Sequence, residues 1–279
     1  MEQSKIKQLQ QTACRVRLGI IEGVHAAKSG HPGGSLSIAD ILTYLYFEKM
    51  NIDPKNPKMP ERDRLVLSKG HAAPAWYAVL AERGYFEKAE LQKLRHTNGM
   101  LQGHPDMKHI PGVDMSSGSL GQGISAACGM ALSAKHFGNP YRVYTIVGDG
   151  ESEEGQVWEA AMFAAAKKLN NLTAFIDVNG LQIDGTVEEV NNPLPLDEKF
   201  KAFGWNVVVI NGHDFAEIAS AVAAAEAEQS RPTAIVCKTV KGKGVSFMEN
   251  QVGWHGAAPN DEQYETAVSE LNAQLAALQ

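Results

Sequence analysis

The sequence has few cysteines, no long hydrophobic run and no excess of positive charge. Its three cysteines, Cys14, Cys128 and Cys237, lie far apart in apolar surroundings, which predicts reduced, buried thiols and offers no ligand pairs for a zinc site. The longest uncharged helical run, AAMFAAA at residues 160–166, is far shorter than the roughly 20 residues of a transmembrane helix. The charged N-terminus lacks the apolar core of a signal peptide, and a net charge of −6 gives no electrostatic attraction for nucleic acid or anionic membranes. We therefore expect a cytoplasmic protein that binds neither.

Short runs rich in β-branched residues alternate with helical segments in the second half of the chain. The runs cover residues 141–147, 172–178, 206–210 and 233–238, and the helical segments cover about 156–169, 196–203 and 214–228. Residues 63–68 predict one more strand. This order of strand, helix and strand predicts an α/β fold of three layers, with a mainly parallel sheet and helices on both faces. No linker or change of composition divides residues 1–279, so we expect a single domain.

A Gly-Asp-Gly turn follows an apolar strand in IVGDGESEEG, residues 146–155. Four carboxylates lie within six residues, on Asp149, Glu151, Glu153 and Glu154. Together they would repel a bare phosphate, but they would attract a divalent cation. The segment therefore favours a ligand that combines a cation with an anion.

Asp149 ends one predicted strand and Asn179 ends the next, so their side chains should converge at the carboxyl edge of the sheet, where α/β proteins bind ligands. A carboxylate, an amide oxygen and the main-chain carbonyl of Leu181 suit Mg²⁺, or another divalent cation such as Ca²⁺ or Mn²⁺, which would bridge the protein to a diphosphate. Gly150 keeps the backbone bare so that phosphates can approach. Either motif alone is typical of an ordinary turn or hairpin. The coupling of the two favours an ion site.

Four histidines stand beside glycine in irregular segments: His31 in SGHPGG, His71 in SKGHA, His104 in QGHPD and His255 in GWHG. Histidines on such loops can face a ligand and titrate near neutral pH. Each one alone is typical of a solvated loop residue, whereas the set favours a site. The remaining histidines are interpreted as structural: His25, His96, His109, His136 and His213.

The coupling of Gly-Asp-Gly with an asparagine thirty residues later resembles the signature of thiamine diphosphate enzymes. From about Lys5 to Pro259 the chain resembles the transketolase family in particular, through SGHPGG, SKGHA, QGHPD, GSLGQG and GWHG. This resemblance implies the thiamine diphosphate-binding fold of the diphosphate-binding type. It also implies thiamine diphosphate and a divalent cation as cofactors.

The resemblance gives the four histidines roles around the cofactor and the sugar. His31 and His255 match the pair that assists deprotonation of the donor's hydroxyl group, and His255 also lies beside the cofactor. His104 matches a ligand of the donor's C1 hydroxyl and carbonyl oxygens. His71 matches a residue that touches the cofactor and the intermediate. Such groups suit a reaction that removes a hydroxyl proton as a carbon–carbon bond breaks.

Other positions match cofactor contacts of the family. The backbone of Gly118 and Leu120 would meet the aminopyrimidine and the diphosphate, and Lys241 matches a lysine on the phosphate side. Lys69 is a weaker candidate of the same kind. Glu154 resembles a residue that relays between paired sites.

The resemblance also implies a partner. In the family, the glutamate that activates the cofactor lies in a second domain, and this sequence ends before such a domain. We therefore expect the N-terminal subunit of a split transketolase, with the pyrimidine-binding and C-terminal domains on a separate partner subunit. The partner subunit would complete each site across an interface, and we expect homodimer contacts within a heterotetramer. A shortened piece of a longer chain would have the same sequence.

The expected reaction is transfer of a two-carbon ketol unit from a ketose phosphate, such as xylulose 5-phosphate, to an aldose phosphate, such as ribose 5-phosphate. This would be a step of the pentose phosphate pathway. A subunit resembling dihydroxyacetone synthase or deoxyxylulose phosphate synthase is the alternative enzyme, and the paired SGHPGG and GHPD histidines favour transketolase over the latter. A catalytically silent binding subunit is the third alternative, but it would have no physical need for the intact polar groups.

Overall fold

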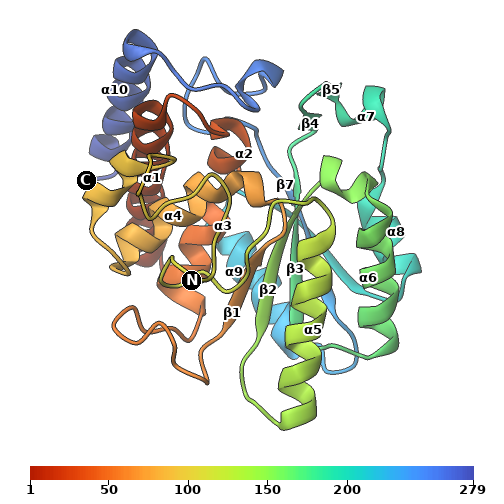
Figure 1. The fold of residues 1–279 in the computed structure, drawn as a ribbon. Coiled ribbons are helices and arrows are strands. Elements are labelled where there is room, and N and C mark those ends of the chain that lie inside the picture. Colours follow the sequence, from red (N-terminus) through yellow and green to blue (C-terminus); the bar gives the residue numbers. More distant parts are fainter.

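The computed structural model describes all 279 residues. Its centre is a sheet of five parallel strands in the order β1-β2-β3-β7-β6 (Figure 1). The strands are β1 (Arg64–Leu67), β2 (Val143–Gly148), β3 (Leu172–Val178), β6 (Asn206–Asn211) and β7 (Thr233–Lys238). Each lies within two residues of its predicted bounds, and the mainly parallel sheet is confirmed. None of the helices combines the length and apolar character needed to cross a membrane.

Helices cover both faces of this sheet, as predicted. One face carries the larger hydrophobic core, of 46 buried residues. Its helices are α1 (Gln3–Ala27), α2 (Pro32–Leu36), α3 (Ala39–Tyr44), α4 (Ala73–Arg83), α9 (Phe215–Ala227) and α10 (Asp261–Ala277). The other face carries a core of 20 buried residues beneath α5 (Gln122–Phe137), α6 (Gly155–Ala166) and α8 (Leu196–Ala202). Figure 1 shows the two groups of helices on opposite sides of the strands.

Side chains of the strands alternate between the two cores. Tyr144 and Ile146 of β2 belong to the larger core, whereas Val143 and Val147 of the same strand belong to the smaller one. All of β2 is buried. A parallel strand covered on both faces needs apolar residues at every position, which explains why these segments are continuous hydrophobic runs.

Two short elements near the carboxyl edge of the sheet were not predicted. After β3 the chain forms an antiparallel hairpin of β4 (Leu181–Gln182) and β5 (Gly185–Thr186), followed by α7 (Val187–Val190). In addition, α6 ends at Ala166 rather than near residue 169. It ends there because Lys168 takes a left-handed conformation, with φ of 52°, which no α-helix continues.

Candidate active site

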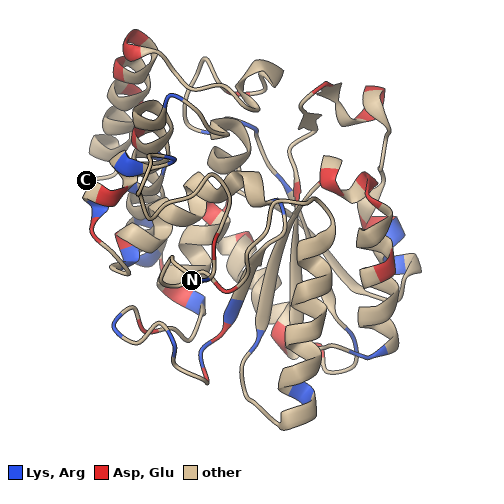
Figure 2. Cartoon of the chain, in the orientation of Figure 1, with Lys and Arg blue, Asp and Glu red and all other residues tan.

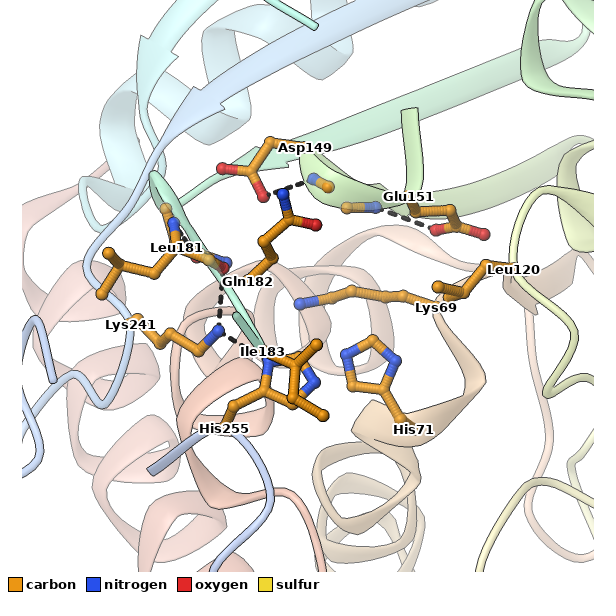
Figure 3. Close-up of a pocket in the computed structure, with 13 residues that line it drawn as sticks. Lys69, His71, Leu120, Asp149, Glu151, Leu181, Gln182, Ile183, Lys241 and His255 are labelled. Atoms are coloured by element: carbon orange, nitrogen blue, oxygen red, sulfur yellow. Dashed lines mark hydrogen bonds between the residues drawn. The ribbon is translucent and has the colours of Figure 1, made fainter. Parts of the chain in front are cut away.

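A pocket of about 110 Å³ lies where β2 and β3 end (Figure 3). Because these strands are parallel neighbours, with Gly148 paired to Asp177, the residues that follow them meet at one edge. The pocket is lined by most of the predicted site residues: His71, Leu120, Asp149, Gly150, Asn179, Leu181, Lys241 and His255. Lys69, Gly148, Glu151, Gln182 and Ile183 complete the lining.

The three predicted ion ligands lie on two neighbouring turns, after β2 and after β3, which a hydrogen bond connects. The Asp149 carboxylate accepts hydrogen bonds from the amide of Gly180 at 2.6 Å and from that of Gly150 at 2.9 Å. The Asn179 side chain donates to the Asp177 carboxylate at 2.8 Å, so its oxygen faces the other way and accepts from the amide of Leu181 at 3.2 Å. Asn179 therefore has a fixed amide orientation.

Burial disfavours the charged form of the Asp149 carboxylate. The residue is 2% exposed, and desolvation, followed by the charge of Asp177, raises the pKa of Asp149 to about 6. A cation beside this carboxylate would offset both effects. No group of three or more histidine, cysteine, aspartate and glutamate side chains is arranged to hold a metal ion, here or elsewhere. One carboxylate, one amide oxygen and one carbonyl nevertheless suit Mg²⁺, which takes few protein ligands.

The remaining acids of the IVGDGESEEG segment do not face the ion ligands, which corrects the expectation that all four attract the cation. Glu151 turns inward and is 3% exposed. Its carboxylate accepts hydrogen bonds from Ser68 Oγ at 2.6 Å and from the amides of Gly121 and Gly148 at 2.9 Å each. Glu153 accepts from the side chain of Gln182. Figure 2 shows acidic residues in the segment just before α6.

Glu151 ties together three segments that wall the pocket, so its replacement should loosen them. Glu151→Gln is expected to lower the free energy of unfolding by about 1–3 kcal/mol, because an amide cannot accept all three hydrogen bonds and leaves a buried donor unpaired. Urea denaturation measures the change. Glu153→Gln is the matched control and should alter stability by less than about 0.5 kcal/mol. Equal stability of the two variants would contradict the inference.

The four predicted histidines gather around the pocket. The ring centroid of His31 lies 5.3 Å from that of His71, 5.6 Å from that of His255 and 6.5 Å from that of His104. The rings of His71 and His255 stack at 5.1 Å. The Nδ1 atom of His31 is buried without a hydrogen-bond partner. A buried polar atom without a partner is free to contact a ligand or a water.

Three of these histidines, His31, His71 and His255, do not titrate near neutral pH, contrary to the sequence-based expectation. Burial and the charge of Arg95 lower the pKa of His31 to about 4. Burial and the charge of Lys241 lower the pKa of His255 to about 3. The pKa of His71 is held well below its usual value by burial and by Lys69. All three rings are therefore neutral at pH 7.

The stability of the chain should depend on pH through these rings. In the unfolded state His31 would bind a proton below the ordinary histidine pKa of about 6.5. In the folded state it binds this proton only below about pH 4, so the proton favours the unfolded state between these two values. Stability is therefore expected to fall between pH 6.5 and 5, by about 1 kcal/mol for this residue. Calorimetry of His31→Gln should show a shallower fall, whereas His136→Gln, an exposed control on α5, should keep the original slope. Parallel curves would contradict this account.

Two charged residues at the site were missed from the sequence. The charge of Arg95 contributes to the lowered pKa of both His31 and His104. Arg95 lies outside every motif of the sequence analysis, so nothing in the sequence predicted its role. Asp177 is fully buried and accepts hydrogen bonds from Lys69, Ser37, Asn179 and Thr239. The sequence feature that could have revealed Asp177 is a single acidic residue inside the apolar run LTAFIDV. Lys69 Nζ lies 2.6 Å from this carboxylate and is 2% exposed, so it is engaged beneath the pocket rather than free for a phosphate.

Three predicted residues lie outside the first pocket, in addition to His31. His104 and Gly118 line a second hollow of about 460 Å³, together with Ser117. Glu154 is exposed at the start of α6. It lies close to Gly121, since a Cβ added to Gly121 would be 2.9 Å from the Cβ of Glu154. The proposed contacts of these residues remain predictions.

The family described as the thiamine diphosphate binding domain of transketolase matches residues 8–275. The chain belongs to this family. It is 50% identical to the 6-deoxy-6-sulfo-D-fructose transketolase subunit SqwG of Clostridium sp. (strain MSTE9), over 94% of this chain and 96% of that one. It is 40% identical to an apulose-4-phosphate transketolase subunit of Phocaeicola vulgatus, over 94% and 93%. It is 41% identical to human transketolase, over 98% of this chain but 44% of that one.

Solved transketolases share the fold. The transketolase of Campylobacter jejuni superposes with a TM-score of 0.89 at 32% identity, covering all of this chain and 46% of that one. This transketolase-family chain thus spans less than half the length of the human and Campylobacter jejuni transketolases. It spans nearly the whole length of the Clostridium and Phocaeicola vulgatus subunits. The predicted family and fold are confirmed, and thiamine diphosphate is the cofactor that the family's domain binds.

Proposed function

We propose that the chain is the N-terminal subunit of a cytoplasmic transketolase. Together with a C-terminal subunit, it would transfer a two-carbon ketol unit from a ketose phosphate, such as xylulose 5-phosphate, to an aldose phosphate, such as ribose 5-phosphate. The observation that carries this proposal is the set of four clustered histidines, three of them kept neutral, beside the oxygen atoms of Asp149, Asn179 and Leu181. A silent binding subunit would not need histidines whose burial costs stability.

The two turns that follow β2 and β3 suit the tail of the cofactor. Asp149, Asn179 and the carbonyl of Leu181 would hold a divalent cation, which would in turn hold the diphosphate. At Gly150, an added Cβ would lie 3.0 Å from Gln182, so a side chain would crowd the turn. When bound, thiamine diphosphate supplies a nucleophilic carbon that accepts the two-carbon unit.

The histidines would then handle protons and sugar oxygens. A general base must be deprotonated before it accepts a proton, and the lowered pKa values keep His31 and His255 in that form at pH 7. In this proposal, either ring would take the donor's hydroxyl proton as the carbon–carbon bond breaks. His104 would contact the donor's C1 hydroxyl and carbonyl oxygens, and His71 would contact the cofactor.

A separate partner chain belongs to this proposal. SqwG and its apulose-4-phosphate counterpart are both named as transketolase subunits, and this chain covers 96% and 93% of them. The C-terminal subunit would supply the activating glutamate and the pyrimidine-binding domain. Two copies of each chain would form a heterotetramer.

Reconstitution tests the proposal. The purified chain alone should show no ketol transfer, and addition of a C-terminal transketolase subunit with Mg²⁺ and thiamine diphosphate should produce it. The assay should include pentose phosphates, 6-deoxy-6-sulfofructose and apulose 4-phosphate as separate donors, because the names of the two relatives specify modified sugars. Cofactor binding by the reconstituted pair without transfer from any ketose would overturn the proposal. Turnover of pyruvate instead would favour the relative of deoxyxylulose phosphate synthase.

A further inference from the structure

Lys241 connects the proposed ion site to the histidine cluster. Its side chain is among the largest fully buried ones, and the residue is 1% exposed. The ammonium donates a hydrogen bond to the carbonyl of Leu181 at 2.8 Å and lies 2.8 Å from Nδ1 of His255. Figure 3 shows the Lys241 side chain reaching between these two partners. Burial, followed by the charge of Lys69, lowers the pKa of Lys241 to about 8.

The backbone around Lys241 is fixed, so a change of contact must come from its side chain. The amide of Val240 donates to His213 Nε2 at 2.9 Å, and that of Gly242 donates to the carbonyl of Gly33 at 3.0 Å. The carbonyl of Lys241 itself accepts from the amide of Asn250. A Cβ on Gly33 would lie 3.0 Å from Cγ and 3.2 Å from Cε of Lys241, so the stem packs tightly as far as Cε, and a change of contact falls to the ammonium at its end.

The ammonium and the proposed ion share one oxygen. A magnesium ion lies about 2.1 Å from a ligand oxygen, and the ammonium lies 2.8 Å from the carbonyl oxygen of Leu181. Bound together on that oxygen, the two cations would be at most about 5 Å apart in a buried site, where like charges repel strongly. Binding of the ion at Leu181 therefore requires the ammonium to withdraw.

An anion in the same pocket would give the withdrawn ammonium a new partner. We propose that Lys241 opposes binding of the divalent ion alone and releases Leu181 when a diphosphate arrives, so that ion and diphosphate bind cooperatively. This inference rests on the proposed function of the pocket. It concerns the order of contacts within that pocket and assigns Lys241 as the residue that couples them.

Withdrawal of the Lys241 ammonium would also change the hydrogen bonding of His255. An ammonium has no lone pair, so Nδ1 of His255 must accept the hydrogen bond from Lys241 and the ring proton must lie on Nε2. Withdrawal of Lys241 frees Nδ1. Arrival of the diphosphate would thus release a nitrogen of one of the histidines proposed to take the donor's proton.

Two affinities measured on Lys241→Met test this inference. Mn²⁺ serves as the probe, with free Mn²⁺ followed by electron paramagnetic resonance and thiamine diphosphate binding followed by calorimetry. Without thiamine diphosphate, the variant should bind Mn²⁺ at least fivefold more tightly than the unchanged chain, because the opposing charge is gone. At saturating Mn²⁺ it should bind thiamine diphosphate at least tenfold more weakly. A purely structural role would weaken both.

Lys243→Met is the matched control. Lys243 lies on the same loop, is partly exposed and pairs with Glu249 at 3.2 Å, so its replacement should change both affinities by less than twofold. Lys241→Gln, which keeps a hydrogen-bond donor without the charge, should repeat the tighter binding of Mn²⁺; circular dichroism checks that each variant is folded.

Unchanged or weaker Mn²⁺ binding in both Lys241 variants would overturn the inference. The same titration on Asp149→Ala separates this outcome from failure of the proposed site. If that variant still loses Mn²⁺-dependent binding of thiamine diphosphate, the site stands and only the role of Lys241 is wrong.

Discussion

Replacing Asp149 with alanine is expected to weaken magnesium-dependent binding of thiamine diphosphate at least 100-fold. The Asp149 carboxylate is the only charged group among the three proposed ion ligands, and burial together with the charge of Asp177 raises its pKa. Its loss removes the main attraction for the ion and, through the ion, for the diphosphate. Calorimetric titration with the cofactor, with and without Mg²⁺, measures the effect.

The control for this prediction is Glu153→Ala. Glu153 lies on the same turn, but its carboxylate meets Gln182 rather than the ion ligands. Its variant should bind the cofactor within threefold of the unchanged chain. Unaltered magnesium dependence in Asp149→Ala would move the ion elsewhere.

Replacing Lys69 with methionine is expected to lower the free energy of unfolding by about 3–5 kcal/mol, the usual cost of leaving one member of a buried ion pair unpaired. Burial alone would raise the pKa of Asp177, but the charge and hydrogen bond of Lys69 lower it. Without the lysine, a fully buried carboxylate keeps only neutral donors. Urea denaturation, with the midpoint and slope fitted together, gives the change.

A double variant shows whether the unpaired charge is the cause. Lys69→Met combined with Asp177→Asn removes both charges, and the amide oxygen still accepts hydrogen bonds from Ser37 and Asn179, so no buried charge is left unpaired. The double variant should therefore regain most of the lost stability. A loss below about 1 kcal/mol in Lys69→Met alone would show that the pair contributes little.

The sequence predicted the sheet because its strands are covered on both faces. Runs such as LTAFIDV are apolar at nearly every position, and their alternation with helices restricts the topology. The hairpin of β4 and β5 was not predicted because two-residue strands are too short to show a period. The end of α6 was placed too late because the left-handed conformation of Lys168 leaves no mark in the hydrophobic pattern.

The candidate site was predictable where motifs bring oxygen and nitrogen atoms to strand ends. Asp149 and Asn179 follow adjacent strands, so their meeting required only the parallel order of β2 and β3. Contacts between distant segments were not predictable, because nothing local marks them. The inward turn of Glu151 toward Ser68 and the bond from Lys241 to the carbonyl of Leu181 are of this kind.

Protonation was the weakest part of the sequence-based interpretation. A histidine beside glycine suggests an exposed loop with an ordinary pKa. The fold instead buries His31 and His255 and places Arg95 and Lys241 near them. Burial and nearby cations both disfavour the charged imidazole, so the direction of the shift depends on three-dimensional neighbours.

Anomalous diffraction from crystals grown with Mn²⁺ and thiamine diphosphate tests the ion site most directly. We predict one strong manganese peak about 2.0–2.4 Å from an Asp149 carboxylate oxygen, the Asn179 side-chain oxygen and the Leu181 carbonyl oxygen, with the diphosphate on its open side. A manganese peak away from these three oxygens, or a diphosphate bound elsewhere, would contradict the account.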